Sequence, residues 1–209
     1  MKKVVVIGCV GTAQNIIEQI ADAANKSQVD FSLYGIVVDS FPGNSIIAGV
    51  PVLGGKKVIP ELLADNDVYF IFALYKPEIL KERYHLMRNL NIPRDRYINF
   101  VHPSVFVAGT VTMGVGNVIL SNSTINSNVI IGDMNIFNSN VAVEHDTVIG
   151  NGNFFAAGSV VGSSVSLGNH CFIGLNSSIR EDVSIDEVYV GMGSIILNDC
   201  KKCSIIGKN

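Results

Sequence analysis

The sequence feature that most constrains the fold is an apolar residue at every sixth position from Val101 to Ile185. A period of six fits neither the 3.6-residue period of a helix nor the plain alternation of a strand. It is typical of a parallel β-helix, in which each hexapeptide forms one short strand and one corner. We call these apolar residues leaders; they are Val101, Val107, Met113, Ile119, Ile125, Ile131, Phe137, Val143, Ile149, Phe155, Val161, Leu167, Ile173, Ile179 and Ile185.

The residue after each leader is usually small or polar, as at Gly114, Gly132 and Gly150. We expect every leader to point into the core and its small neighbour to allow the tight turn at the corner. The repeat therefore predicts a prism with its own continuous core over residues 101–209.

Residues 1–100 lack this period and show instead the alternation of strands and helices that is typical of an α/β domain. We expect strands over 3–7, 31–38, 68–73 and 97–100, with helices after Gly11 and over 77–90. This order predicts a small parallel sheet with its ligand at the carboxyl ends of the strands. The chain is thus predicted to have two domains, 1–100 and 101–209.

The first predicted strand runs into Gly8-Cys9-Val10-Gly11-Thr12 and then into a helix. Free backbone N–H groups and the helix dipole at such a turn favour a phosphate. Asp39 follows the second strand, where it can accept a hydrogen bond from a ribose hydroxyl or simply form a turn before Ser40. Too few residues remain for a second mononucleotide half, so one nucleotide is expected rather than NAD.

Composition and cysteine count exclude several classes of function. A net charge of −3 provides no basic surface for nucleic acid. No apolar run approaches the roughly 18 residues of a membrane span, and the run after Lys3 is too short for a signal peptide, so a cytoplasmic protein is expected. Cys200 and Cys203 form a C-x-x-C motif without the second pair that a zinc site needs, and no metal is predicted.

His145 is the strongest candidate for chemistry. It lies two places after the leader Val143, so its side chain should point away from the prism, and Asp146 is its neighbour. A histidine held by a carboxylate is a general base suited to neutral pH, because the anion stabilises the imidazolium. Asn138 lies in the preceding hexapeptide where glycine or alanine is usual. These residues alone leave open that His145 is only a structural corner residue.

With these residues, the chain resembles the nucleotide-sugar acetyltransferase family of bacillosamine and sialic acid biosynthesis, from Gly8 to Gly193. The resemblance implies a Rossmann-like nucleotide-sugar-binding domain followed by a left-handed β-helix of three hexapeptides per coil. It implies transfer of an acetyl group from acetyl-CoA to an amine, or in some members a hydroxyl, of a sugar. It also implies a homotrimer with coenzyme A between neighbouring prisms.

The same resemblance assigns roles to residues. His145 matches the base, Asp146 the acid that raises its basicity, and Asn138 a neighbouring polar residue. The stacking of three hexapeptides per coil puts Ser163 beneath His145, and its N–H is the expected oxyanion donor. The remaining assignments are Gly8, Val10, Gly11, Thr12, Asp39, Ser40 and Ala73 for the nucleotide sugar, and Phe154, Ser163, Leu175 and Met192 for acetyl-CoA.

Three functions remain open at this point. N-acetylation of a nucleotide-linked amino sugar is the first, and O-acetylation of a sugar such as sialic acid is the second, since both acceptors give a proton to the same base. The third is a nucleotide-sugar-binding protein without transfer activity. Phe154 favours the third, because it stands where many relatives have a second histidine that helps to hold acetyl-CoA.

Overall fold

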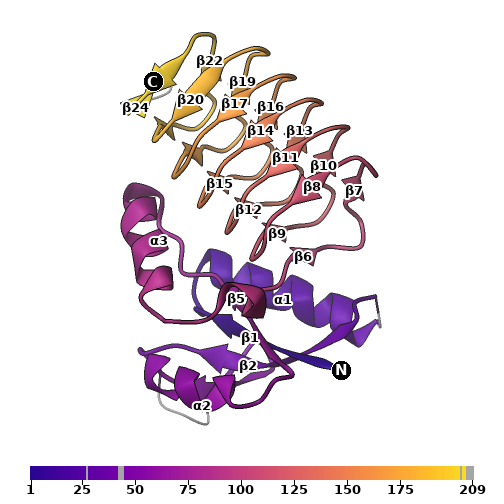
Figure 1. Ribbon diagram of the computed structural model, residues 1–209, viewed down its shortest axis with the longest axis vertical. Helices are drawn as coiled ribbons and strands as arrows, with labels where there is room; N and C mark the ends of the chain where they lie inside the picture. Colours follow the sequence, from indigo (N-terminus) through magenta and orange to yellow (C-terminus); the bar gives the residue numbers. More distant parts are fainter. Residues whose placement is uncertain (27, 42–44, 203, 206–209) are drawn as a thin grey trace.

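The computed structural model describes residues 1–26, 28–41, 45–202 and 204–205. An α/β domain lies against one side of a long prism of stacked coils (Figure 1). The α/β domain contains β1 (Lys2–Ile7), α1 (Thr12–Asn25), β2 (Phe31–Val37), β3 (Ile46–Ile47), β4 (Val50–Gly54), the 3-10 turn η1 (Lys56–Val58), α2 (Ile59–Leu63), β5 (Val68–Phe72), the 3-10 turn η2 (Pro77–Ile79), α3 (Leu80–Arg88) and the 3-10 turn η3 (Arg94–Arg96).

The sheet of the α/β domain has the order β3-β4-β2-β1-β5. Strands β1, β2, β4 and β5 are parallel, and only β3 pairs antiparallel to its neighbour. Helix α1 covers the sheet with an apolar face that repeats at helical spacing and includes Ile16, Ile17 and Ile20, all fully buried. The predicted parallel sheet is therefore confirmed, and its strand β1, which lies between β2 and β5, is buried from Val4 to Ile7.

Two expectations for this domain were wrong in detail. The predicted strand 97–100 pairs with this sheet through an isolated bridge between Tyr97 and Phe70, because Phe100 already lies in the first strand of the prism. The helix expected over 77–90 begins as the η2 turn, and α3 covers only Leu80–Arg88. Strands β3 and β4 and helix α2 were not predicted at all.

The prism consists of three parallel sheets of very short strands. Its repeating pattern fits a left-handed β-helix. The first sheet contains β6 (Phe100–Val101), β9 (Val118–Ile119), β12 (Ile136–Phe137), β15 (Phe154–Phe155), β18 (Phe172–Ile173), β21 (Tyr189–Val190) and β24 (Ser204–Ile205). The second sheet contains β7 (Phe106–Val107), β10 (Thr124–Ile125), β13 (Ala142–Val143), β16 (Val160–Val161), β19 (Ser178–Ile179) and β22 (Ile195–Ile196). The third sheet contains β8 (Thr112–Met113), β11 (Ile130–Ile131), β14 (Val148–Ile149), β17 (Ser166–Leu167), β20 (Ser184–Asp186) and β23 (Cys200–Lys201).

Strand register confirms three hexapeptides per coil. Ile125 pairs with Val143, and Phe137 pairs with Phe155, in each case 18 residues along the chain. The rings of Phe137 and Phe155 stack with centroids 4.4 Å apart. Every leader from Ile119 to Ile185 is buried, whereas the three before it are only partly buried because they lie in the open first coil.

The tight turn at each corner lies elsewhere than the sequence predicted. The residue with left-handed backbone is the third after the leader, as at Asn128 and Asp146, both with φ of 60°. The small residue beside the leader is required for stacking instead: a Cβ on Gly132 would lie 2.6 Å from the carbonyl oxygen of Gly150 in the next coil. The corner residues are mostly Asn, Asp, Ser or Gly, which adopt this conformation at low cost.

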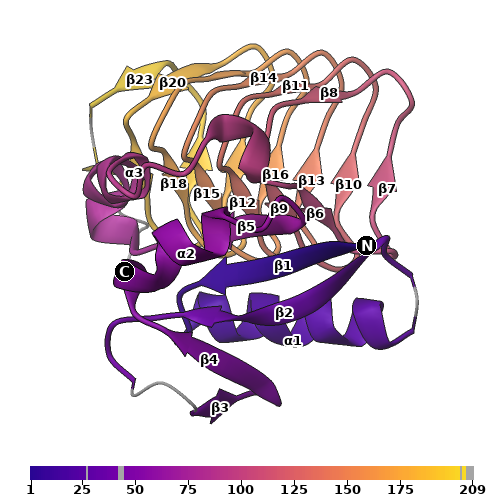
Figure 2. The same ribbon diagram turned by 60° about the horizontal axis from the view of Figure 1, so that its bottom comes forward.

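The α/β domain covers the first sheet of the prism, and the third sheet lies on the far side (Figure 2). Leu120 and Phe154 pack in one apolar cluster with Ile20 of α1. Polar contacts flank this cluster: the backbone N–H of Ser121 donates to Gln19, and the Tyr75 hydroxyl donates to the carbonyl of Met134 at 2.8 Å. The α/β elements and the outer face of the first sheet therefore share one apolar cluster.

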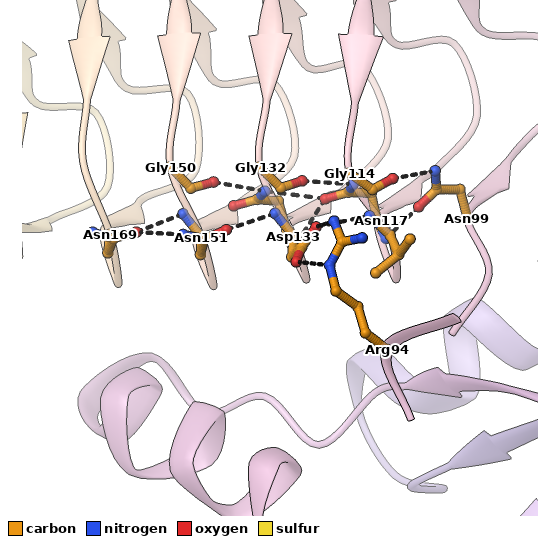
Figure 3. A network of polar contacts seen from close by, with 11 residues as sticks. Arg94, Asn99, Gly114, Asn117, Gly132, Asp133, Gly150, Asn151 and Asn169 are labelled. Carbon is orange, nitrogen blue, oxygen red and sulfur yellow. Dashed lines mark hydrogen bonds and ion pairs between the residues drawn. The ribbon is translucent and has the colours of Figure 1, made fainter. Parts of the chain in front are cut away.

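An ion pair closes the junction at the corner between the third and first sheets (Figure 3). Arg94 donates from Nε and Nη2 to the two carboxylate oxygens of Asp133, at 2.8 and 2.7 Å. Asp133 also accepts from the N–H of Val115, and its own N–H donates to Asn151 in the next coil. Although partial burial raises the pKa of Asp133, the Arg94 hydrogen bonds and the Val115 N–H hold it below its ordinary value.

Asp133→Asn is expected to lower the free energy of unfolding by about 1.5–3 kcal/mol near pH 7, as for other hydrogen bonds to charged groups. The pKa of this carboxyl is lower in the folded chain than the unfolded value of about 3.9. Its stabilisation is thus fully present above that value and is lost as the pH falls through the folded pKa. In urea titrations from pH 7 to pH 3, the difference from wild type should shrink below pH 4. Asp95→Asn, at an exposed site nearby, is the control. If the difference in unfolding free energy between wild type and Asp133→Asn stays constant with pH, this account is wrong.

Candidate functional site

His145 and Asp146 lie at the corner that joins β13 of the second sheet to β14 of the third, which we call the second–third corner. Nδ1 of His145 is 2.7 Å from Oδ2 of Asp146, and the two side chains are 56% and 51% exposed. The predicted orientation away from the prism and the predicted pairing are both found. The left-handed backbone of Asp146 turns its side chain back toward the histidine.

The protonation of this pair follows from its hydrogen bonds. The bond with His145 and, next, a bond from Asn128 hold the pKa of Asp146 below its ordinary value. An ionised carboxylate only accepts, so the hydrogen lies on Nδ1 of His145. Nε2 of the neutral imidazole then has its lone pair free, which is the arrangement that a general base requires.

Two asparagines of the preceding coil hold carboxylates on either side of His145. Nδ2 of Asn128 donates to Oδ1 of Asp146 at 2.9 Å, and Nδ2 of Asn126 donates to Glu144 at 3.1 Å. Sequence reasoning missed Asn128, which is a partner of the pair, and the neighbouring contact between Asn126 and Glu144. The signal was present, because each asparagine precedes its carboxylate by one 18-residue coil and Glu144 occupies a position that is usually small.

Ser163 lies one coil beyond His145, as the spacing predicted. The carbonyl of His145 accepts from the N–H of Ser164 at 2.9 Å, which fixes the stacking of the two corners. The N–H of Ser163 has no acceptor within the described ranges. A free N–H next to a general base is suited to stabilise an oxyanion.

Asn138 is not beside His145. Asn138 follows β12, at the corner between the first and second sheets, which we call the first–second corner. Strand β13 separates Asn138 from His145. Its Oδ1 is buried and has no hydrogen-bond partner in the described part of the chain. An unpaired buried acceptor is unfavourable by about 1–3 kcal/mol, which suggests that an external donor, such as water or substrate, completes it.

The glycine loop lies at the carboxyl end of β1, as predicted. Gly8 and Gly11 have positive φ values of 121° and 61°. A Cβ on Gly8 would meet the backbone of Ala73 at 3.2 Å, so the loop passes close to the end of β5. No acceptor for the N–H groups of Val10, Gly11 and Thr12 occurs among the described residues, and Val10 is exposed. These free donors are suited to a phosphate.

Asp39 has a structural partner in the chain itself. Its Oδ1 accepts from the N–H of Lys56 at 2.8 Å, and Nζ of Lys56 lies 3.8 Å from Oδ2. Asp39 therefore links the end of β2 to the η1 turn, and its predicted contact with a nucleotide stays a prediction. Ser40 beside it is exposed.

The residues assigned to acetyl-CoA lie at several places on the prism. Leu175 and Met192 are exposed and stack at the first–second corner, where the N–H of Gly193 donates to the carbonyl of Leu175. Ser163 is at the second–third corner. Phe154 is only 5% exposed, because Tyr75 and Phe172 pack against its ring under the α/β domain.

Within one chain, the two halves of the predicted site, which are the glycine loop and the His145–Asp146 pair, thus lie apart. The α/β domain covers the first sheet, whereas His145 lies at the corner opposite that sheet. The outer faces that meet at this corner carry exposed apolar residues, including Ile130 and Val148 of the third sheet and Val160 of the second. Exposed apolar side chains around a polar pair are typical of a surface that another molecule covers.

No helix in the described ranges is long and apolar enough to cross a membrane. Over the same ranges, no group of three or more His, Cys, Asp or Glu side chains is arranged to hold a metal ion. Cys203, the second cysteine of the C-x-x-C motif, lies outside the described residues.

Comparison with known proteins gives matches among solved structures alone. No family model and no curated protein sequence matches the chain. PerB from Caulobacter crescentus, solved in complex with CoA and GDP-perosamine, is 26% identical, with a TM-score of 0.80 over 96% of this chain and 91% of its own. The acetyltransferase domain of PglB from Neisseria gonorrhoeae is 19% identical, with a TM-score of 0.75 over 95% and 93%. A histidine-to-asparagine variant of perosamine N-acetyltransferase from Caulobacter crescentus is 23% identical, with a TM-score of 0.66 over 96% and 91%.

Proposed function

We propose that this protein, whose structural neighbours are sugar acetyltransferases of the hexapeptide transferase family, transfers the acetyl group of acetyl-CoA to the amino group of a nucleotide-linked sugar. The observation that carries this proposal is the exposed His145–Asp146 pair, on a chain whose fold matches that of an enzyme solved with CoA and GDP-perosamine.

The proposed reaction is a direct transfer. Nε2 of His145 removes a proton from the sugar amine while the amine nitrogen attacks the thioester carbonyl. The N–H of Ser163 stabilises the oxyanion of the tetrahedral intermediate. The C–S bond then breaks, and the proton on His145 passes to the departing sulfur, so that N-acetyl sugar and free CoA result.

The acceptor is proposed to bind to the α/β domain, which we interpret as a Rossmann-like nucleotide-sugar domain. The free N–H groups of Val10, Gly11 and Thr12 are suited to its phosphates, with Gly8 and Ala73 shaping the loop. Asp39 and Ser40 follow the neighbouring strand and are suited to the ribose or base.

A complete site then requires a second subunit, because His145 and the glycine loop lie on different sides of one chain. We propose a homotrimer. In it, the second–third corner of one subunit faces two parts of the neighbouring subunit, its α/β domain and its first–second corner. Coenzyme A would lie between the prisms, against Ser163 of one subunit and Leu175 and Met192 of its neighbour. Asn138 and the wall formed by Phe154 would complete the pocket from that neighbour.

The test is to incubate the protein with acetyl-CoA and amino sugars linked to GDP, UDP and dTDP, following thiol release and product mass. We expect thiol release with one of them and a mass gain of about 42 daltons, the arithmetic difference between an acetyl group and a hydrogen. Transfer only to hydroxyl acceptors such as sialic acid would replace N-acetylation by O-acetylation. Failure to bind acetyl-CoA would favour the binding-protein alternative.

Asp146→Asn is expected to reduce kcat by about 10-fold, because a neutral amide no longer stabilises the imidazolium that forms when His145 takes the proton of the amine. Steady-state rates at pH 7 measure this loss. Asp182→Asn is the matched control, since Asp182 has the same left-handed corner conformation two coils away. Wild-type kcat in Asp146→Asn would mean that the carboxylate is not coupled to the base.

A further inference from the structure

A column of hydrogen bonds runs along the second–third corner and ends on His145. The backbone N–H of Asn128 donates to Oγ1 of Thr110 at 2.8 Å, and Nδ2 of Asn128 donates to Oδ1 of Asp146 at 2.9 Å. Oδ2 of Asp146 is the oxygen that pairs with Nδ1 of His145. The two oxygens of this carboxylate thus have separate partners, one above it in the column and one beside it.

The backbone explains why this amide meets this carboxylate. Asn128 and Asp146 both have φ of 60° and occupy the same corner position in consecutive coils. Their side chains therefore leave the backbone in parallel and lie one above the other. Asn122, Asn140 and Asn176 share the left-handed conformation, but within the described residues their amides donate to no carboxylate.

The neighbouring pair shows that the contact with His145 is particular to this column. Asn126 holds Glu144 in the same way, one residue before His145. In the described part of the chain, however, no hydrogen bond joins Glu144 to the imidazole. Of the amides of Asn126 and Asn128, only that of Asn128 contacts the carboxylate that orients the base.

We propose that Asn128 is a positioning residue for the reaction, which acts on His145 through Asp146; this inference rests on the proposed function. A carboxylate on an exposed corner with one partner is free to rotate about its Cβ–Cγ bond. The second hydrogen bond removes that freedom and keeps Oδ2 aimed at Nδ1. The imidazole is then held with Nε2 directed outward, toward the acceptor amine.

Asn128→Gly tests this proposal, because glycine adopts φ of 60° without strain and only the amide is lost. We expect kcat to fall about 3- to 10-fold with KM for acetyl-CoA unchanged, since the lost interaction orients the base rather than binds the donor. Asn91→Gly makes the same substitution at a residue with φ of 55°, which follows α3 and lies away from Asp146, and it should keep the wild-type rate. Wild-type kcat in Asn128→Gly would overturn the proposal.

Two further measurements separate positioning from a general structural effect. In an Asp146→Asn background, Asn128→Gly should cause no further loss of kcat, because the carboxylate through which Asn128 acts is already absent. A loss of kcat equal to that of Asn128→Gly in the wild-type background would overturn the proposal. Carbon-13 NMR should show the titration of the Asp146 carboxyl at higher pH in Asn128→Gly, because the Asn128 hydrogen bond helps to hold that pKa down. This second readout needs no turnover. Suppose that the wild-type protein acetylates no sugar, so that the proposed function fails. An unchanged titration of the Asp146 carboxyl in Asn128→Gly would then still disprove the contact between Asn128 and Asp146. A shifted titration would confirm that contact without the proposed function.

Discussion

His145→Ala is expected to lower kcat for sugar acetylation by about 100-fold or more, within the range that a general base contributes. The side chain is exposed and its only described side-chain partner is Asp146, so its removal leaves the packing of the prism intact. KM for acetyl-CoA should therefore change little. Steady-state kinetics with the acceptor that the panel of nucleotide-linked amino sugars identifies, together with size-exclusion chromatography for subunit assembly, measure both expectations.

The matched control for this variant is His85→Ala. His85 is an exposed histidine on α3, in the other domain and away from the second–third corner. It should retain wild-type kcat. If His145→Ala also keeps wild-type turnover, His145 is not the base, and the proton of the amine must pass to another group or to water.

Leu167→Ala is expected to lower the free energy of unfolding by about 2–5 kcal/mol, the range for a buried leucine in a packed core. Leu167 is a leader, 2% exposed, and its strand pairs with those of Ile149 and Ile185 in the coils on either side. Because each coil contacts only its neighbours, the cavity left by the leucine side chain would weaken the packing of three successive coils. This loss is large compared with the 5–15 kcal/mol that stabilise a typical protein.

Leu197→Ala is the control for the core variant, because Leu197 belongs to the same prism but is 50% exposed. It should change the unfolding free energy by less than about 1 kcal/mol, as expected for a surface substitution. Urea titrations at one fixed protein concentration measure both variants, since subunit association makes apparent stability concentration-dependent. Equal losses in the two variants would mean that the leaders do not form the core.

The prism was predictable because its pattern is local and repeated. Each hexapeptide contains its own inward residue, such as Ile131 or Phe155, and the same choice is repeated along the chain, so errors at one position do not alter the register. The α/β domain was less predictable. Strands β3 and β4 are short, and Tyr97 is placed by the packing of a turn against the sheet, which depends on residues far away in sequence.

The sequence by itself determined the six-residue period, the inward leaders and the neighbouring pair His145–Asp146, since all three depend on spacing along the chain. Only the tertiary structure decided which residues meet across coils and across domains. Asn128 reaches Asp146 because 18 residues close one coil, and Arg94 reaches Asp133 because the α/β domain covers the first sheet. The same closure put His145 on the side away from the glycine loop. That separation follows from how three sheets enclose a prism, which no short stretch of sequence encodes.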